Sequence, residues 1–162
     1  GAIGYTAARD NTTARTLTTT VSDGSRSTQA LSTINITPVN DAPTLNPAAT
    51  LGGGRVDTAY EITYDDLRAA IDVADVDTSS PTILITRIDA GTVQKWSGTA
   101  WVAVSTAARV PLAQRLLSAG EKIRWVPPSG VSGNRAAFKA KAWDGVLNST
   151  VTTQVTINLA EA

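Results

Sequence analysis

Three groups of oxygen-bearing side chains are the residues of this sequence with the most readily named chemistry. Calcium takes roughly six to eight oxygen ligands from carboxylates, side-chain amides and backbone carbonyls. Loops at the ends of a β-sandwich can bring such donors together from distant parts of a chain. The residues in question are Asn40 and Asp41, then Asp72, Asp75 and Asp77, and finally Asp144.

Two tryptophans offer a different chemistry, because sugars stack on exposed aromatic faces. Trp96 and Trp101 bracket one tight turn, and Trp143 falls on the polar side of its predicted strand. The alternative is structural: Trp96 and Trp101 then form a cross-strand pair that stabilises a hairpin, and Trp125 belongs to the core. The sequence leaves both interpretations open.

Catalytic chemistry has few candidate residues. The chain contains no Cys and no His, which excludes thiolate nucleophiles, imidazole bases and the common zinc sites. Paired carboxylates such as Asp65 with Asp66, or Asp75 with Asp77, can formally act as acid and base. Neighbouring carboxylates in exposed loops are usually only solvated, so we predict that the chain is not an enzyme.

Charge and hydropathy exclude further classes of partner. Fourteen Lys and Arg residues balance fourteen Asp and Glu residues, so no excess positive field attracts nucleic acid. No apolar run approaches the roughly 20 residues of a membrane helix. We therefore expect no nucleic-acid partner and no membrane insertion by this segment.

Two hairpins with the same pattern position these residues. In the first, Leu17, Thr19 and Val21 share a face before an Asp23-Gly24 turn. The second has its Asp-Gly turn at Asp144, a shift of 121 positions, and the strands on either side align without a gap. Self-similarity at about one domain length indicates tandem repeats.

This shift predicts the domain boundaries. Residues 1–38 are expected to be the last two strands of a preceding, incomplete repeat, and residues 39–43 the linker. Residues 44–162 are expected to form one complete repeat. An isolated hairpin cannot bury a core, so the first hairpin is expected to fray, to dock or to swap with another copy.

Within the complete repeat, period-two alternation predicts strands at residues 60–64, 82–88, 93–95, 101–104 and 122–126. A short helix is predicted over residues 65–71, capped by Asp65, with Leu67 and Ile71 facing the core. Residues 112–117 are expected to form a turn or a short helix. The predicted fold is all-β, an antiparallel Greek-key β-sandwich of immunoglobulin or cadherin type with one short helix.

Several segments resemble the cadherin-like repeats of large bacterial surface adhesins and related secreted proteins. They are Ala142-Trp143-Asp144-Gly145, Glu61-Ile62-Thr63, Leu67-Arg68-Ala69-Ala70, Asp75-Val76-Asp77-Thr78, Gly91-Thr92-Val93, Trp125-Val126-Pro127-Pro128 and, most specifically, the linker Val39-Asn40-Asp41-Ala42-Pro43. The resemblance implies a calcium site at the junction between repeats, formed by Asn40, Asp41, Asp75, Asp77 and Asp144. Because most of the preceding repeat is missing, calcium is expected to bind weakly or not at all.

The resemblance also implies a function. The chain is expected to be a non-catalytic spacer of a bacterial surface adhesin or giant secreted protein, located outside the cell and stiffened by calcium between neighbouring repeats. The alternative is a module that binds a glycan or a host protein through the hairpin of Trp96 and Trp101. Asp41, Asp23 and Asp144 also have a structural interpretation, because Asp is favoured in turns.

Overall fold

The computed structural model describes residues 13–161. The chain divides into two compact units, Gly1–Asn40 and Asp41–Ala162. This division falls inside the predicted linker, residues 39–43. Residues 1–12 of the predicted first repeat lie outside the described part of the chain. No helix within residues 13–161 has the length and apolar character to cross a membrane.

The first unit contains one antiparallel hairpin, in which β1 (Arg15–Ser22) pairs with β2 (Ser27–Ile34). The pairing begins at Ser22 opposite Ser27, directly beside the turn. Strand β2 ends at Ile34, four residues before the end of the predicted first repeat at residue 38. Most side chains of the hairpin are exposed, and Leu31 has an exposed fraction of 72%. Such exposure is expected of a two-stranded hairpin, which cannot bury a core by itself.

The Asp-Gly turns of the two units have the same hydrogen bonds. In each, the Asp Oδ1 accepts from the backbone N–H groups two and three residues further on. The distances are 2.8 and 2.7 Å at Asp23, and 2.6 and 2.7 Å at Asp144. The loop at Asp23 spans residues 23–26 rather than the two residues expected of an Asp-Gly hairpin. The carboxylate replaces backbone acceptors and closes this longer turn.

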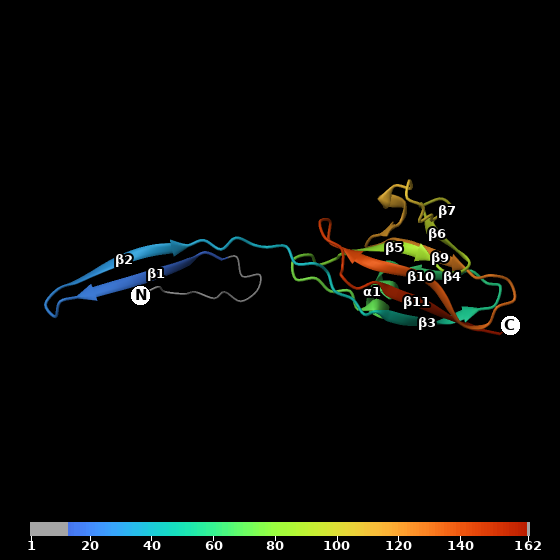
Figure 1. Cartoon of the computed structure of the whole chain (residues 1–162), viewed down its shortest axis with the longest axis horizontal. Helices are drawn as coiled ribbons and strands as arrows, with labels where there is room; N and C mark the ends of the chain where they lie inside the picture. The colour runs from blue at the N-terminus through green and yellow to red at the C-terminus, as the bar shows by residue number, and fades with distance from the viewer. Residues whose placement is uncertain (1–12, 162) are drawn as a thin grey trace. The chain divides into compact units, whose positions relative to one another are not determined.

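The second unit is mostly β-structure with one short helix, as predicted, and its strands form two sheets (Figure 1). The five-stranded sheet has the order β3-β11-β10-β5-β8, and the four-stranded sheet has the order β4-β9-β6-β7. The elements are β3 (Ala48–Arg55), β4 (Tyr60–Thr63), α1 (Tyr64–Ile71), β5 (Thr82–Ile88), β6 (Thr92–Trp96), β7 (Trp101–Ala103), η1 (Leu112–Gln114), β8 (Leu116–Leu117), β9 (Lys122–Val126), β10 (Gly133–Trp143) and β11 (Thr153–Ala160).

Strand β3 departs from the predicted fold in two ways. It pairs with β11 in parallel, so the sandwich is not wholly antiparallel. It also contains Gly52, Gly53 and Gly54. Glycine has low β-propensity, so the sequence pattern did not predict this strand. Pairing with β11 holds the glycine-rich strand at the edge of the five-stranded sheet.

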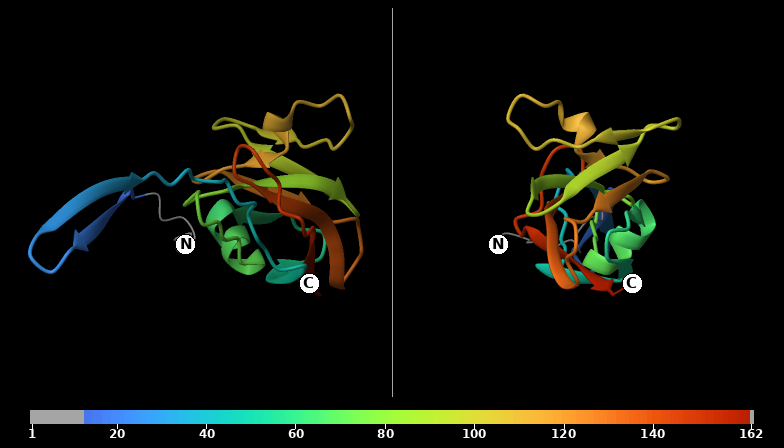
Figure 2. Two further views of the ribbon diagram at one scale, coloured as in Figure 1. Left: turned by 60° about the vertical axis from the view of Figure 1, so that its left-hand side comes forward. Right: turned by 90° about the vertical axis from the view of Figure 1, so that its right-hand side faces the viewer.

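Helix α1 follows β4 without a loop and packs beside β3 and β4 (Figure 2). Its cap is Thr63 rather than the predicted Asp65, because the Thr63 hydroxyl accepts from the N–H of Asp66 at 3.1 Å. Asp65 lies inside the first turn, where a negative charge is favourable. Leu67 and Ile71 are fully buried, as predicted.

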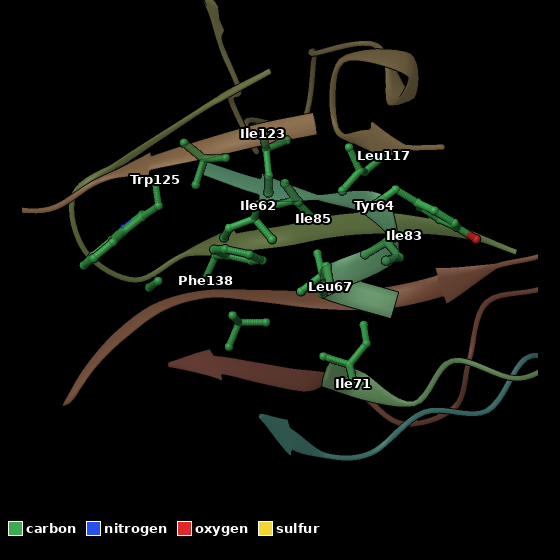
Figure 3. Close-up of a cluster of buried hydrophobic side chains, with 14 of the residues drawn as sticks. Ile62, Tyr64, Leu67, Ile71, Ile83, Ile85, Leu117, Ile123, Trp125 and Phe138 are labelled. Atoms are coloured by element: carbon green, nitrogen blue, oxygen red, sulfur yellow. The ribbon is translucent and has the colours of Figure 1, made fainter. Parts of the chain in front are cut away.

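The core lies between the two sheets, and Figure 3 shows side chains from both sheets and from α1 meeting there. Trp125 is fully buried, which confirms it as a core residue. Its Nε1 donates to the Ala90 carbonyl at 2.7 Å, so the one polar atom of the indole is satisfied. The next residue, Gly91, turns the chain with a positive φ of 65°.

Gly91, in the β5–β6 turn, is predicted to tolerate substitution less well than Gly98, in the β6–β7 turn. A Cβ there would overlap the Val126 carbonyl oxygen and lie 3.0 Å from Trp125 Nε1. Gly98 also has positive φ, but no atom lies within 4 Å of its would-be Cβ. Gly98→Ala should therefore destabilise the fold by about 1–2 kcal/mol, and Gly91→Ala by about 2–5 kcal/mol. Urea denaturation measures both, and equal losses would contradict the packing argument.

The turn at Asp23 is predicted to loosen in acid. Backbone hydrogen bonds from Ser25 and then Arg26 hold the Asp23 pKa below its usual value. The turn is therefore stabilised above the pKa of an unfolded Asp, about 3.9, and loses that stabilisation as the pH falls through the lower pKa of the folded turn. The amide resonances of Ser25 and Arg26 should move with a midpoint below about 3.9. In Asp23→Asn, which keeps the acceptor oxygen, this movement should vanish.

Candidate functional site

The outward face of the four-stranded sheet gathers an unusual set of side chains. On β9, Ile123 and Trp125 are buried while Lys122 and Arg124 point away from the core. The cross-strand register continues this alternation onto the neighbouring strands. The surface, which we name the tryptophan face, is formed by Glu61 on β4, Gln94 and Trp96 on β6, Trp101 on β7, and Lys122 and Arg124 on β9.

Trp96 and Trp101 are direct cross-strand partners at the end of the β6–β7 hairpin. Their ring centroids lie 5.2 Å apart with an angle of 57° between the planes. Ser97 closes the turn between them, with its Oγ accepting from the N–H of Ala100 at 3.1 Å. Both indoles are half-buried, and the hairpin projects from the sandwich (Figure 2).

Two cations lie against these indoles. The Lys122 Nζ is 5.6 Å from the Trp96 ring centroid and 5.2 Å from that of Trp101. The Arg124 Cζ lies 4.6 Å from the Trp101 ring centroid. Distances below about 6 Å are those of cation–π attraction. The spacing of Trp96 and Trp101 in the sequence does not predict these two cations beside their rings.

Polar partners fix both cations. Lys122 Nζ donates to the Glu61 carboxylate at 2.8 Å, and Arg124 Nε donates to Gln94 Oε1 at 2.6 Å. Sequence reasoning named neither Arg124 nor Gln94 as functional residues. The available signal was the alternation of residues 122–126, which puts Lys122 and Arg124 opposite the buried Trp125.

A cavity of about 240 Å³ lies on the other side of the β6–β7 hairpin. Its apolar lining includes Trp96, Ala103 and Val102, which is 48% exposed. Lys95 and Glu121 also line it and form a salt bridge of 2.8 Å. Trp96 therefore belongs both to the tryptophan face and to the lining of this cavity.

The predicted calcium residues lie in two places. Near the linker, the N–H of Asp41 donates to Asp77 Oδ2 at 2.7 Å, and the N–H of Asp77 donates to Asp75 Oδ1 at 2.9 Å. Asp75 Oδ2 is buried and makes no hydrogen bond, which suits a group that could still accept a cation. Asn40 lies next to Asp41, at the boundary of the two units.

The other two candidate calcium ligands, Asp72 and Asp144, have roles in the local backbone structure. Asp144 closes the β10–β11 turn with its carboxylate, and Asp72 ends α1 in the left-handed conformation with φ of 51°. Within residues 13–161, no group of three or more acidic side chains is arranged to hold a metal ion. Calcium binding by Asn40, Asp41, Asp75, Asp77 and Asp144 therefore stays a prediction.

The carboxylate pairs considered for acid–base chemistry also have structural partners. Asp66 Oδ2 accepts from the Thr63 hydroxyl at 2.6 Å in the cap of α1. The Asp75–Asp77 pair is joined through the backbone N–H described above. Trp143, the fourth tryptophan, lies half-buried at the end of β10 in the other sheet.

Among known proteins, the chain has matches to solved structures but to no family model or curated protein. One similar structure is described as the endo-fucoidan hydrolase MfFcnA4 from glycoside hydrolase family 107, with 17% identity and a TM-score of 0.44. A variant of the same enzyme has 19% identity and a TM-score of 0.45. Each match covers 92% of this chain and 19% of the other, so this chain spans about a fifth of their length.

These matches correct the assignment made from the resemblance. The predicted membership in cadherin-like or immunoglobulin-like tandem repeats of adhesins is wrong, because both matched structures are described as fucoidan hydrolases. The predicted role as a non-catalytic, calcium-stiffened adhesion spacer is wrong on the same finding, and so is the prediction that excluded an enzyme. The short motifs that carried the resemblance reflect turns and strand ends, which unrelated sandwiches share.

Calcium binding has a direct test at Asp75. If the acidic residues near the linker bind calcium, calorimetric titration should show a dissociation constant in the range of about 0.1–1 mM. Asp75→Asn should then abolish the heat, because it removes the charge of the buried carboxylate. Asp57→Asn, which changes an acidic residue elsewhere in the second unit, should leave the heat unchanged. Absence of calcium-specific heat in the unaltered chain would contradict the prediction.

Proposed function

We propose that this chain is a glycan-binding module that contacts sugars through the tryptophan face. The observation that carries the proposal is the Trp96–Trp101 pair, with centroids 5.2 Å apart on the outward face of a sheet. The apolar face of a sugar ring stacks on an indole, and neighbouring polar groups then bind its hydroxyls. Gln94 and Glu61 provide such groups on the same face.

Rigidity of the tryptophan face supports this function. The indoles stand on paired strands, and β9 beneath Lys122 and Arg124 is fixed by the buried side chains of Ile123 and Trp125. A surface held by core packing loses little conformational entropy when a ligand binds. The tryptophan face should therefore lose less conformational entropy on binding a ligand than a flexible loop would.

We further propose that the two sheets form a Greek-key sandwich of immunoglobulin type. The chain passes from β4 to β5, then to β6 and β7, and on to β8, β9 and β10, so it alternates repeatedly between the sheets. Such crossing between sheets is characteristic of Greek-key sandwiches. The equivalent turns at Asp23 and Asp144 support the further proposal that β1 and β2 are the last strands of a preceding copy.

Location outside the cell and neighbouring repeats as partners also stay proposals. The balanced charge of the chain, with fourteen basic and fourteen acidic residues, supports the expectation that nucleic acid is not its partner. A glycan partner is compatible with an extracellular location, where polysaccharides are abundant. Fractionation of the producing cells, with detection of the chain in each fraction, tests the location.

Loss of one indole should weaken binding strongly. Trp101→Ala removes the ring that contacts Trp96, Lys122 and Arg124, and aromatic anchors at the centre of a binding surface contribute about 2 kcal/mol or more. We expect affinity for a polysaccharide recognised on a glycan array to fall by about thirtyfold or more. Calorimetry against that polysaccharide measures the loss.

Trp143→Ala is the matched control, because Trp143 is also half-buried but belongs to the five-stranded sheet. It should leave affinity unchanged. Near-ultraviolet circular dichroism checks that both variants keep the fold. A chain that binds no glycan, or that loses as much affinity in Trp143→Ala as in Trp101→Ala, would refute the proposed function.

A further inference from the structure

We propose that the tryptophan face selects acidic glycans, and that Arg124 is the residue that binds their carboxylate or sulfate groups. This inference rests on the proposed function and adds the substrate class to it. Carboxylate and sulfate share the relevant chemistry, since both present paired oxygens with negative charge. A guanidinium donates two parallel hydrogen bonds to such oxygens.

Arg124 is held in a defined orientation. Its Nε donates to Gln94 Oε1 at 2.6 Å, and its guanidinium lies 4.6 Å from the Trp101 ring centroid. Strand β9 lies between β4 and β6 in the sheet, so Arg124 is in the interior of the sheet rather than at its edge. These contacts limit the rotation of the guanidinium and leave its two terminal amino groups for a ligand.

The terminal amino groups of Arg124 have no acidic partner among residues 13–161. Glu61 is the register partner of Arg124 across β4 and β9. The carboxylate of Glu61 nevertheless pairs with Lys122, at 2.8 Å. Lys122 is therefore paired within the tryptophan face, whereas Arg124 makes no salt bridge among residues 13–161.

Two other cations of the same unit do have carboxylate partners. Lys95 pairs with Glu121 at 2.8 Å, and Arg87 pairs with Asp89 at 2.9 Å. A half-buried guanidinium without an ion pair keeps its attraction for an anion. A sugar ring stacked on the Trp96–Trp101 pair would place an acidic substituent beside Arg124, because the guanidinium lies against Trp101.

The test compares polysaccharides that differ only in charge. Dextran sulfate and dextran share one backbone, and polygalacturonate and its methyl ester share another. Calorimetry with the unaltered chain should show at least about tenfold tighter binding to one or both acidic members, as expected for a charge-assisted bidentate contact. The dextran pair reports on sulfate, and the galacturonate pair reports on carboxylate.

Variants assign the preference to Arg124. Arg124→Gln should reduce affinity for the acidic polysaccharide to that for its neutral partner. Arg124→Lys keeps the positive charge but loses the two parallel hydrogen bonds of the guanidinium, so it should retain only part of the preference for the acidic polysaccharide. Arg135→Gln is the matched control, because Arg135 is an exposed arginine on β10 of the other sheet. It should change nothing.

The outcomes separate this inference from the proposed function. Equal affinity for acidic and neutral partners, with both lost in Trp101→Ala, would overturn the acidic preference while supporting glycan binding. An acidic preference that Arg124→Gln and Arg135→Gln reduce equally would show diffuse charge attraction and would also overturn the inference. Binding to none of the polysaccharides would overturn both. Melting temperatures of the Arg124 variants close to that of the unaltered chain exclude unfolding as the cause.

Discussion

The inward packing of Ile123 and Trp125 decides where every functional side chain of β9 lies. Side chains alternate along a strand, so burying these two residues forces Lys122 and Arg124 to the outer surface. A register slip of one position would bury both cations and expose the indole of Trp125. The hydrogen bond from Trp125 to Ala90 anchors the strand further, since it satisfies the buried indole N–H.

The same residues stabilise the hairpin and form the candidate site. Contact between Trp96 and Trp101 contributes about 0.5–1.5 kcal/mol beyond the burial of area. Cation–π contacts at partly exposed sites add about 0.5–1 kcal/mol each. These contacts stabilise a short hairpin, in which β7 spans only three residues. Packing and binding are compatible here, since an indole that contacts neighbours on one side can contact a sugar on another.

Sequence reasoning succeeded where one strand or helix determines its own pattern. Strands β5 and β9 match the predicted residues, and Leu67 and Ile71 face the core. It failed where pairing across strands decides the outcome. Strand β3 is held by β11 despite its glycines, and the contact of Arg124 with Gln94 depends on a register that no single strand encodes.

The resemblance to adhesin repeats misled for a related reason, because short motifs are specified by local geometry. Asp23 and Asp144 accept the same backbone hydrogen bonds in turns 121 positions apart. An Asp-Gly pair at such a turn is explained by the turn alone, whatever the protein does. The pairing of Trp96 and Trp101 also has a structural explanation. That explanation does not account for the two cations that lie against their rings. The hydrogen bond from Arg124 to Gln94 joins β9 to β6, and the salt bridge between Glu61 and Lys122 joins β4 to β9. The proposed recognition of acidic glycans rests on the Arg124 guanidinium, which lies against the Trp101 ring and makes no salt bridge among residues 13–161.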